Sequence, residues 1–479
     1  MATLDHESAN VRAALGWLRG SGHLELGLRL AIAVAWYWDL RGQFDEGRDW
    51  LDGMLRKAAD AGRSMPDDVI AQACSEAGFL AFRRGAYDDA ANRFEEGLRR
   101  AAAIGEHRPQ AWAWHGLAVL RLEQGDVAAS RSAHDEAVRL FEHVGDRRGL
   151  AGAMLNRGIA HFYRGEFDRA QSASEDSLRR FRELRNAAGA AAALTTLGAT
   201  AHYLGHDGQA IALLEEALDL RRALGDHRGT AASLINLGWL ATHGGNYALA
   251  LHYLGQSLPI EEGLGDKRGI ATALDNQGLA MHHLGNNDRA VAVQERALRL
   301  WREIGDSRGV GRSLCVLART SLAAGDEQRA DRLAREALAI LEDLGDQFEL
   351  ASAQQLAADI AGRIGGRRRA AGLLVKAVRL FVSLGMRSDA ASCLEHLAEF
   401  ALGDARTDLA VRLIAVADRL RPDDPSPHES TDTGRRRRVL DACRGTLGSD
   451  WVDACLATAS VDMYEILAEA AAIVAGEET

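Results

Sequence analysis

Glycine recurs along this 479-residue chain in two series that share a period of 40 residues. In the first series each glycine follows an aliphatic residue and precedes an acidic one; its members are Gly105, Gly145, Gly225, Gly265, Gly305 and Gly345, with Arg185 at the missing step. The second series falls midway between them and comprises Gly85, Gly125, Gly165, Gly205, Gly245, Gly285, Gly325 and Gly365. A fixed period of this size is typical of repeat proteins, so the sequence predicts stacked units with two turns each.

The residues beside these glycines indicate that the turns join helices. Glycine readily adopts the left-handed conformation that ends a helix, and a helix-capping residue such as Asp146, Asp226 or Asp266 follows it directly. Between turns, apolar residues recur every three or four positions, as Leu214 and Leu218 do. Each unit is therefore expected to be a hairpin of two helices with roughly 16 residues each.

Small residues occupy fixed positions of the unit. Five residues after each mid-unit glycine the chain has Ala90, Ser130, Ala170, Ala210, Ala250, Ala290, Ala330 and Ala370. Side chains this small allow two helix axes to approach closely, which larger side chains would prevent. The pattern therefore predicts closely packed hairpins.

The unit resembles the tetratricopeptide repeat. The residues that carry this resemblance are Asn236-Leu237-Gly238, Gly245-Asn246-Tyr247, Ala250 and Ser257-Leu258, with a second copy at Asn156, Gly158, Gly165, Phe167, Ala170 and Leu178. The period exceeds the 34 residues of the common form. The resemblance implies an all-α, right-handed superhelical solenoid of about ten helical hairpins, of which about nine are in register over 67–421 and a diverged one covers about 24–60.

The two ends of the chain depart from the repeat. We expect an N-terminal capping helix (1–22), the repeat array (23–421), a Pro-rich linker (422–434) and a C-terminal helical cap (435–479). The linker is predicted because Pro422, Pro425 and Pro427 break helices. The basic run Arg435–Arg438 is interpreted as a solvated helix start, with a nucleic-acid patch as the alternative.

The ends also resemble the repeat arm of large bacterial signal-transduction ATPases of the LuxR/MalT and AfsR kinds. The matching stretches are Leu4–Leu15 and Trp36–Trp38 near the start and Ala410–Asp418 near the end. In that family an ATPase module precedes the arm, and a DNA-binding helix-turn-helix is often linked to it. The sequence contains no G-x-x-x-x-G-K-[ST] phosphate loop and no helix-turn-helix candidate after Val474, so the resemblance implies the regulatory arm, either as a stand-alone protein or as part of a larger chain.

Composition narrows the classes of function. The 57 basic and 68 acidic residues give a net charge of −11, which argues against a general nucleic-acid binder. The polar start Met1–Glu7 lacks signal-peptide features, and the longest apolar run, Leu30–Trp38, is about half of a membrane span. The five cysteines contain no C-x-x-C pair. We therefore expect a cytoplasmic protein with no metal, no cofactor, no membrane contact and no direct nucleic-acid partner.

In solenoids of this type the first helix of each hairpin lines the concave face. When the turn glycine is counted as the fifteenth residue, the second, fifth, ninth and twelfth fall on one stripe of that helix, with the thirteenth beside it. The residues predicted to line the groove are Trp112, His115, Phe162, Tyr163, His202, Tyr203, Asn236, Trp239, His243, Asn276, His282 and His283. Large aromatic residues on such a face are expected to anchor a peptide or helix, and the alternative is that some pack sideways as ordinary core.

An arginine recurs one turn before this stripe, at Arg108, Arg148, Arg228, Arg268 and Arg308. A cation in the first turn of a helix opposes the helix dipole, so its recurrence needs a reason. One interpretation is a row of guanidinium groups that binds an acidic peptide. The other is pairing between repeats with an Asp or Glu of the preceding helix.

Other chemistry has little support in the sequence. His202, His243 and His282 come from successive hairpins, yet no pair with metal-ligand spacing occurs. Asp275 and Glu395 are examples of carboxylates near the groove that are interpreted as solvated. No catalytic motif is found, so we predict a non-enzymatic scaffold that binds a peptide or protein segment in its groove. The alternatives are a sensor of a small-molecule effector and, third, an enzyme.

Overall fold

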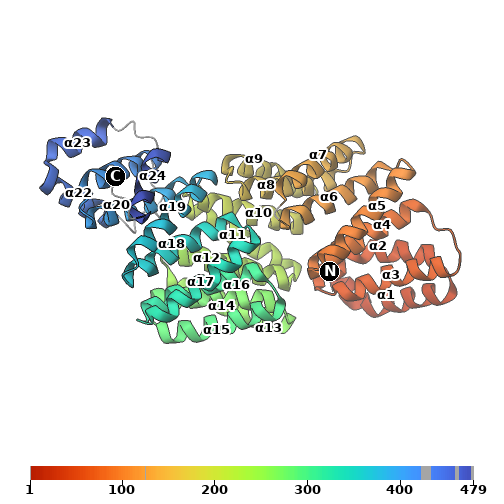
Figure 1. The fold of residues 1–479 in the computed structure, drawn as a ribbon. Coiled ribbons are helices and arrows are strands. Elements are labelled where there is room, and N and C mark those ends of the chain that lie inside the picture. The colour runs from red at the N-terminus through yellow and green to blue at the C-terminus, as the bar shows by residue number, and fades with distance from the viewer. Residues whose placement is uncertain (1, 125, 422–432, 459–462, 476–479) are drawn as a thin grey trace. The chain divides into compact units, whose positions relative to one another are not determined.

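A computed structural model describes residues 2–124, 126–421, 433–458 and 463–475 (Figure 1). The described residues form helices and turns and contain no β-strand. Helices therefore make up the whole regular structure, and the predicted all-α fold class is confirmed. The chain divides into two compact units, Met1–Ser233 and Leu234–Thr479, called unit 1 and unit 2 below.

Unit 1 contains α1 (Ala2–Ser21), α2 (Leu24–Arg41), α3 (Phe44–Asp60), α4 (Asp67–Arg84), α5 (Tyr87–Ala103), α6 (His107–Glu123), α7 (Val127–His143), α8 (Arg147–Tyr163), α9 (Phe167–Glu183), α10 (Ala187–Tyr203) and α11 (Asp207–Leu224). Helix α12 (His227–His243) runs along the chain from unit 1 into unit 2. Unit 2 continues with α13 (Tyr247–Leu264), α14 (Lys267–His283), α15 (Asn287–Ile304), α16 (Ser307–Ala323), α17 (Glu327–Leu344), α18 (Gln347–Arg363), α19 (Arg367–Ser383), α20 (Arg387–Gly403), α21 (Thr407–Leu420), α22 (Thr433–Leu447), α23 (Ser449–Thr458) and α24 (Met463–Ala475).

The turns form as the glycine pattern predicts. Gly105, Gly145 and the other described turn glycines have positive φ, the left-handed conformation that closes a helix. At the step where the glycine is missing, Arg185 adopts φ 52°. After the turn at Gly145, Asp146 caps helix α8, because its Oδ1 accepts the backbone N–H of Gly149 at 2.9 Å.

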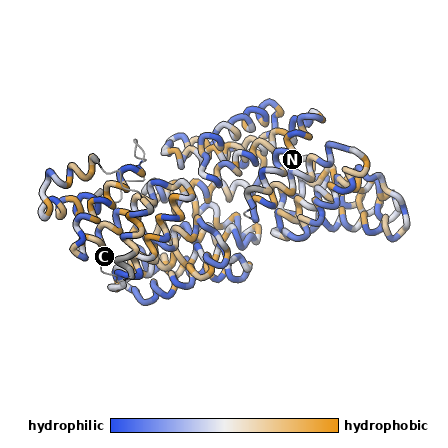
Figure 2. Tube along the Cα trace, turned by 45° about the horizontal axis from the view of Figure 1, so that its top comes forward, coloured by the Kyte–Doolittle hydropathy of each residue, from blue (hydrophilic) through white to orange (hydrophobic). Residues whose placement is uncertain are grey.

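Small residues lie where the helices pack most closely. Ala90 and Ala210 are fully buried, and so are the alanines at the same position of the later repeats. Helix pairs such as α4–α5 and α10–α11 pack along their length. At Gly116 an added Cβ would lie 2.2 Å from a ring carbon of the buried Phe94, so glycine alone fits there. Figure 2 shows apolar residues along the packed helix faces and hydrophilic ones at many of the turns.

Replacing Ala210 by leucine is expected to destabilise unit 1 by about 1–3 kcal/mol, because the closely packed pair α10–α11 has no space for the larger side chain. Chemical denaturation followed by circular dichroism measures this change. Ala212→Leu is the matched control, since Ala212 lies exposed on the same helix. Equal stability of the two variants would contradict close packing at Ala210.

Both ends of the array carry extra helices. Helix α1 covers most of the segment 1–22 expected to form the N-terminal cap, and its Leu15 is buried in the same apolar cluster as Leu28 of α2. At the other end, α24 packs against α19 and α21. The predicted linker lies almost entirely outside the described residues, except that α22 already includes Thr433 and Gly434.

The basic run Arg435–Arg438 forms ion pairs between α22 and the helices of the array. Arg435 pairs with Glu399 of α20 at 3.0 Å, and Arg436 pairs with Asp418 of α21 at 2.7 Å. These cations therefore face acidic partners within unit 2 rather than forming a wholly solvated helix start. Among the described residues, none of the helices is both long and apolar enough to cross a bilayer.

Candidate functional site

Contacts between helices identify the inner face of each unit. In unit 1 the first helices of successive hairpins contact one another, as α2 does with α4, α4 with α6, and α6 with α8. In unit 2 the same holds for α14 with α16 and α16 with α18. The row of helices that lie closest together is on the inside of a curve, so the first helices line the concave face, as the sequence predicted.

A cluster of aromatic rings lies on α4 and α6 in unit 1. The ring of Trp112 lies 6.3 Å from Phe79 and 5.2 Å from the buried Phe141, and its Nε1 donates to Asp146 at 3.3 Å. His115 is buried next to Phe79, at 5.9 Å, and burial lowers its pKa to about 3, so it is neutral. Trp112 is thus half core and half surface, whereas His115 belongs mainly to the core.

A second aromatic cluster lies at the C-terminal ends of α8 and α10. Phe162 packs 5.2 Å from Tyr203, and Phe167 of α9 stacks on Tyr203 at 5.1 Å. Tyr163 is 66% exposed and Tyr203 is 40% exposed, so both present ring surface to solvent. His202 is buried, and its Nδ1 lies 2.7 Å from Oδ1 of Asp207.

The predicted groove residues of unit 2 lie on α12 and α14. The rings of Trp239 and His243 are 4.2 Å apart, and His283 stacks on Tyr247 at 4.7 Å. Nδ1 of His282 lies 2.9 Å from Oδ1 of Asn287. Asn236 and Asn276 are half-buried. The described part of the chain contains no cluster of residues suited to hold a metal ion.

The recurring arginines find partners in the next repeat. Ion pairs join Arg108 to Asp146 at 2.9 Å, Arg268 to Asp306 at 2.6 Å and Arg308 to Asp346 at 2.8 Å. In each pair the acidic residue is the N-cap of the first helix of the following repeat, and it does not come from the preceding helix. Arg228 lies over the Phe44 ring at 5.2 Å, and Arg148 is exposed. An acidic ligand would therefore have to compete with these carboxylates at Arg108, Arg268 and Arg308.

Two carboxylates interpreted as solvated are buried. Asp275 accepts hydrogen bonds at 2.8 Å from Nε1 of Trp301 and at 2.8 Å from Oγ of Ser313, and burial still raises its pKa to about 6. Glu395 is fully buried and pairs with Arg421. Their partners lie 26 to 38 residues away in the sequence, so no local pattern marks these acids as buried.

The concave face of unit 1 also contains residues that sequence reasoning missed. Phe79 joins the first aromatic cluster, and Trp36 is 42% exposed on α2. The count of positions from the turn glycine, applied to the hairpins that begin at 24 and 67, places both residues on the predicted groove stripe. Glu76, one turn before Phe79, occupies the position that asparagine holds in the repeats of Asn236 and Asn276.

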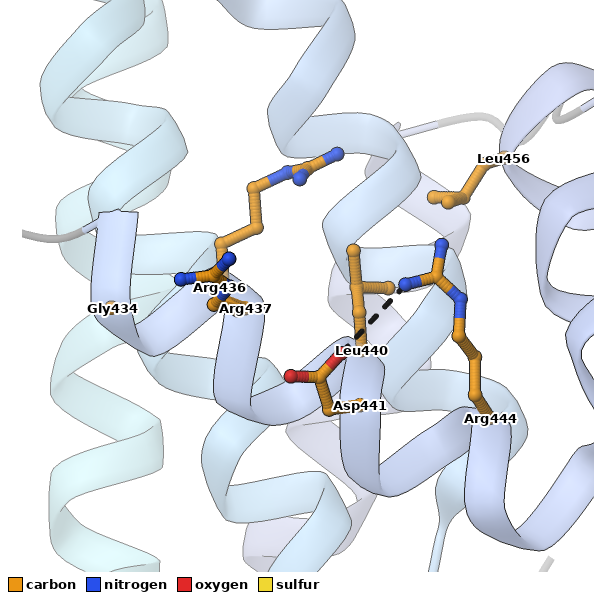
Figure 3. A pocket seen from close by; sticks show the side chains of 7 residues that line it. All are labelled: Gly434, Arg436, Arg437, Leu440, Asp441, Arg444 and Leu456. Atoms are coloured by element: carbon orange, nitrogen blue, oxygen red, sulfur yellow. Dashed lines mark ion pairs between the residues drawn. The ribbon is translucent and has the colours of Figure 1, made fainter.

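A hollow of about 530 Å³ lies beside α22 and is lined by Arg436, Arg437, Leu440, Asp441, Arg444 and Leu456, with Gly434 at its edge (Figure 3). Among the described residues, two of its three arginines form ion pairs. Arg436 pairs with Asp418, and Arg444 pairs with Asp453 at 2.9 Å and with Asp441 at 3.8 Å. These arginines therefore hold the C-terminal helices, and we place the candidate site on the concave faces.

Comparison with known families identifies the repeat. The family model described as "Tetratricopeptide repeat" matches residues 149–223, 189–262 and 269–343. These stretches therefore match the tetratricopeptide repeat, and helix pairs of the same kind lie on either side of them in the chain. No curated protein sequence matches the chain.

Several solved structures share this fold. A Rap protein complexed with Competence and Sporulation Factor is 13% identical, with a TM-score of 0.60 over 75% of this chain and 99% of that one. The apo form of the quorum sensor NprR from B. thuringiensis is 13% identical, with a TM-score of 0.54 over 74% and 99%. Aspartyl phosphate phosphatase F from Bacillus subtilis is 12% identical, with a TM-score of 0.50 over 74% and 93%. At these identities the likeness shows the fold alone.

Proposed function

We propose that the concave faces of this repeat array bind a peptide or protein segment. The observation that carries the proposal is the set of aromatic side chains that project partly exposed from consecutive first helices, with Trp112, Tyr163 and Tyr203 as the main examples in unit 1. Aromatic residues of this kind anchor partners because they bury a large apolar area and lose little side-chain entropy. The Rap structure, which was solved with a bound factor, supports a binding role for this fold.

The proposed context is the regulatory or sensor arm of a bacterial signalling or transcription-control system, without catalysis of its own. The likeness of the chain ends to the arm of LuxR/MalT- and AfsR-type regulators supports this context. The alternative is a small-molecule effector sensor that uses the same groove. Because one structure of this fold is described as a phosphatase, turnover of an aspartyl phosphate by the isolated protein would overturn the non-enzymatic role.

Alanine at Tyr203 and alanine at Trp239, made separately, are expected to weaken binding of a peptide selected from a displayed random library by roughly thirtyfold or more. The thermal unfolding midpoint is expected to change little, because both side chains lie partly exposed on the first helices. Fluorescence anisotropy measures the dissociation constant, and calorimetry measures the midpoint.

Tyr253→Ala is the matched control, since Tyr253 lies on α13, the second helix of its hairpin. Full binding by the control and loss in the other two variants supports a groove site. A collapsed unfolding transition in Tyr203→Ala or Trp239→Ala would mark that residue as core. Stabilisation by metabolites with no peptide selected would favour the effector sensor.

A further inference from the structure

A second cavity lies near the C-terminal end of unit 2, where α24 packs against α19 and α21. It has a volume of about 300 Å³ and is lined by residues of α19, α20, α21 and α24. The residues predicted to line the peptide groove lie on α6 to α16. This cavity is therefore a different site from the groove.

The interior of the cavity is apolar. Its lining includes side chains of one buried apolar cluster, each at most 5% exposed: Ala371, Leu397, Ala401, Leu413 and Ala470. Such surface binds the apolar part of a ligand because both surfaces are removed from water. A volume of about 300 Å³ is at the lower end of the range for ligand sites, so it suits a small molecule.

The ring of Phe400 forms one wall of the cavity and is held by its neighbours. It stacks on His396 at 4.8 Å, and an added Cβ at Gly362 would lie 3.0 Å from its Cζ, so the ring also packs directly on α18. His396 is held in turn by Asp359, whose Oδ1 lies 2.9 Å from its Nδ1. This wall is therefore formed before a ligand binds, which lowers the entropic cost of binding.

Helix α24 supplies another wall through Ala470. The neighbouring residue Glu469 pairs with Arg406, the N-cap of α21, at 2.9 Å and with Arg412 of α21 at 2.7 Å. These ion pairs attach α24 to the last hairpin of the array. A ligand in the cavity would therefore contact the C-terminal cap and the array together.

Two guanidinium groups also line the cavity. Arg367 and Arg368 belong to the first turn of α19, where a cation opposes the helix dipole and does not stabilise the helix. Arg367 lies 3.5 Å from Asp404, a long contact between exposed side chains that contributes little stability. Within the described part of the chain, no hydrogen bond or ion pair holds the exposed side chain of Arg368. The cavity thus combines an apolar interior with a net positive rim.

We propose that this cavity binds a small carboxylic acid with a short aliphatic or aromatic substituent. The carboxylate pairs with the guanidinium groups, whose planar N–H donors match its two oxygens, and the substituent lies against Leu413 and Phe400. Asp404 shares Arg367, so Arg368 supplies the main contact. An amine of the same shape would meet like charges at this rim. Because α24 forms one wall, the bound acid stabilises the C-terminal cap on the array.

Isothermal titration calorimetry of the full chain with hexanoate and phenylacetate tests this site. At least one of the two acids is expected to bind with a dissociation constant of about 1 mM or below. Acetate, hexanol and hexylamine are expected to bind at least about tenfold more weakly, because each lacks either the apolar substituent or the negative charge.

Two variants locate the binding. Arg368→Gln is expected to weaken binding of the acid by about tenfold, since the variant loses charge-assisted hydrogen bonds. Arg379→Gln is the matched control, because Arg379 is exposed on the same helix and does not line the cavity. Both side chains are exposed, so circular dichroism is expected to show that both variants fold as the wild type does.

The outcomes are distinct from those of the peptide test. Binding of an acid that is weakened by Arg368→Gln and kept by Arg379→Gln supports the site. Equal binding of hexanol or hexylamine, or an affinity for the acid that is unchanged in Arg368→Gln, overturns it. Absence of binding by both acids at about 10 mM also overturns it and leaves the proposed peptide groove unaffected.

Discussion

Truncation of Trp301 to alanine is expected to destabilise unit 2 by about 3–5 kcal/mol. The Trp301 side chain is 2% exposed and packs in a cluster with Leu298, Leu314 and Leu317. Its removal leaves a large cavity, and it also removes the N–H that hydrogen-bonds the buried carboxylate of Asp275. Urea denaturation of the full chain, followed by the circular dichroism of the helices, measures the loss.

The phenylalanine variant separates the two contributions. Trp301→Phe retains most of the buried ring but lacks the indole N–H, so we expect a smaller loss of about 1–3 kcal/mol, set mainly by the hydrogen bond that Asp275 loses from one of its two oxygens. Equal stability of Trp301→Ala and the wild type would mean that this side chain is not in the core. A loss in Trp301→Phe as large as in the alanine variant would assign most of the stabilisation to the hydrogen bond.

Asp275→Asn is expected to stabilise unit 2 at pH 7.5 by up to about 3 kcal/mol. Burial raises the pKa of Asp275 from 3.8 to about 6 in the folded protein, although Trp301 and Ser313 both donate hydrogen bonds to it. A difference of this size corresponds to roughly 3 kcal/mol of preference for the neutral form. Asparagine is neutral and retains a carbonyl oxygen that accepts from Trp301.

The direction of the pH dependence follows from the raised pKa. The folded state binds the proton more tightly than the unfolded chain, so the contribution of Asp275 to stability is fully present below pH 3.8 and is lost as the pH rises through 6. The gain from Asp275→Asn is therefore expected to be small at pH 4 and complete at pH 7.5. Denaturation at both pH values measures it, with the exposed Asp343→Asn as control. A gain independent of pH would contradict a shifted Asp275.

Prediction from sequence succeeded where the governing interactions are local. The turn glycines, the capping residues and the buried alanines follow from short-range rules of helix geometry, and these features are found where the pattern places them. The resemblance to tetratricopeptide repeats is confirmed over residues 149–262 and 269–343. The groove residues lie on the inner helices, and their role in binding stays a prediction.

Prediction was less complete where a side chain could contact either of two neighbours with a similar free energy. The recurring arginines were open to two interpretations. Arg108, Arg268 and Arg308 pair with the N-cap of the next repeat. Asp275 was interpreted as solvated, yet its partners come from the following hairpin. Phe79 was missed because the count of groove positions began one hairpin too late. Each of these outcomes depends on how one hairpin meets the next.

The sequence by itself determined the helical hairpins, their order and the helix face that turns inward, because helix capping, left-handed turns and apolar spacing act within a few residues. Only the tertiary structure decided which charges are compensated. Arg41 donates to the backbone carbonyl of Gly225 across 184 positions, and the buried Asp275 accepts hydrogen bonds from Trp301 and Ser313 of the two following helices. Electrostatic pairing depends on distance and on the loss of water, and both are set by the curvature of the stacked hairpins.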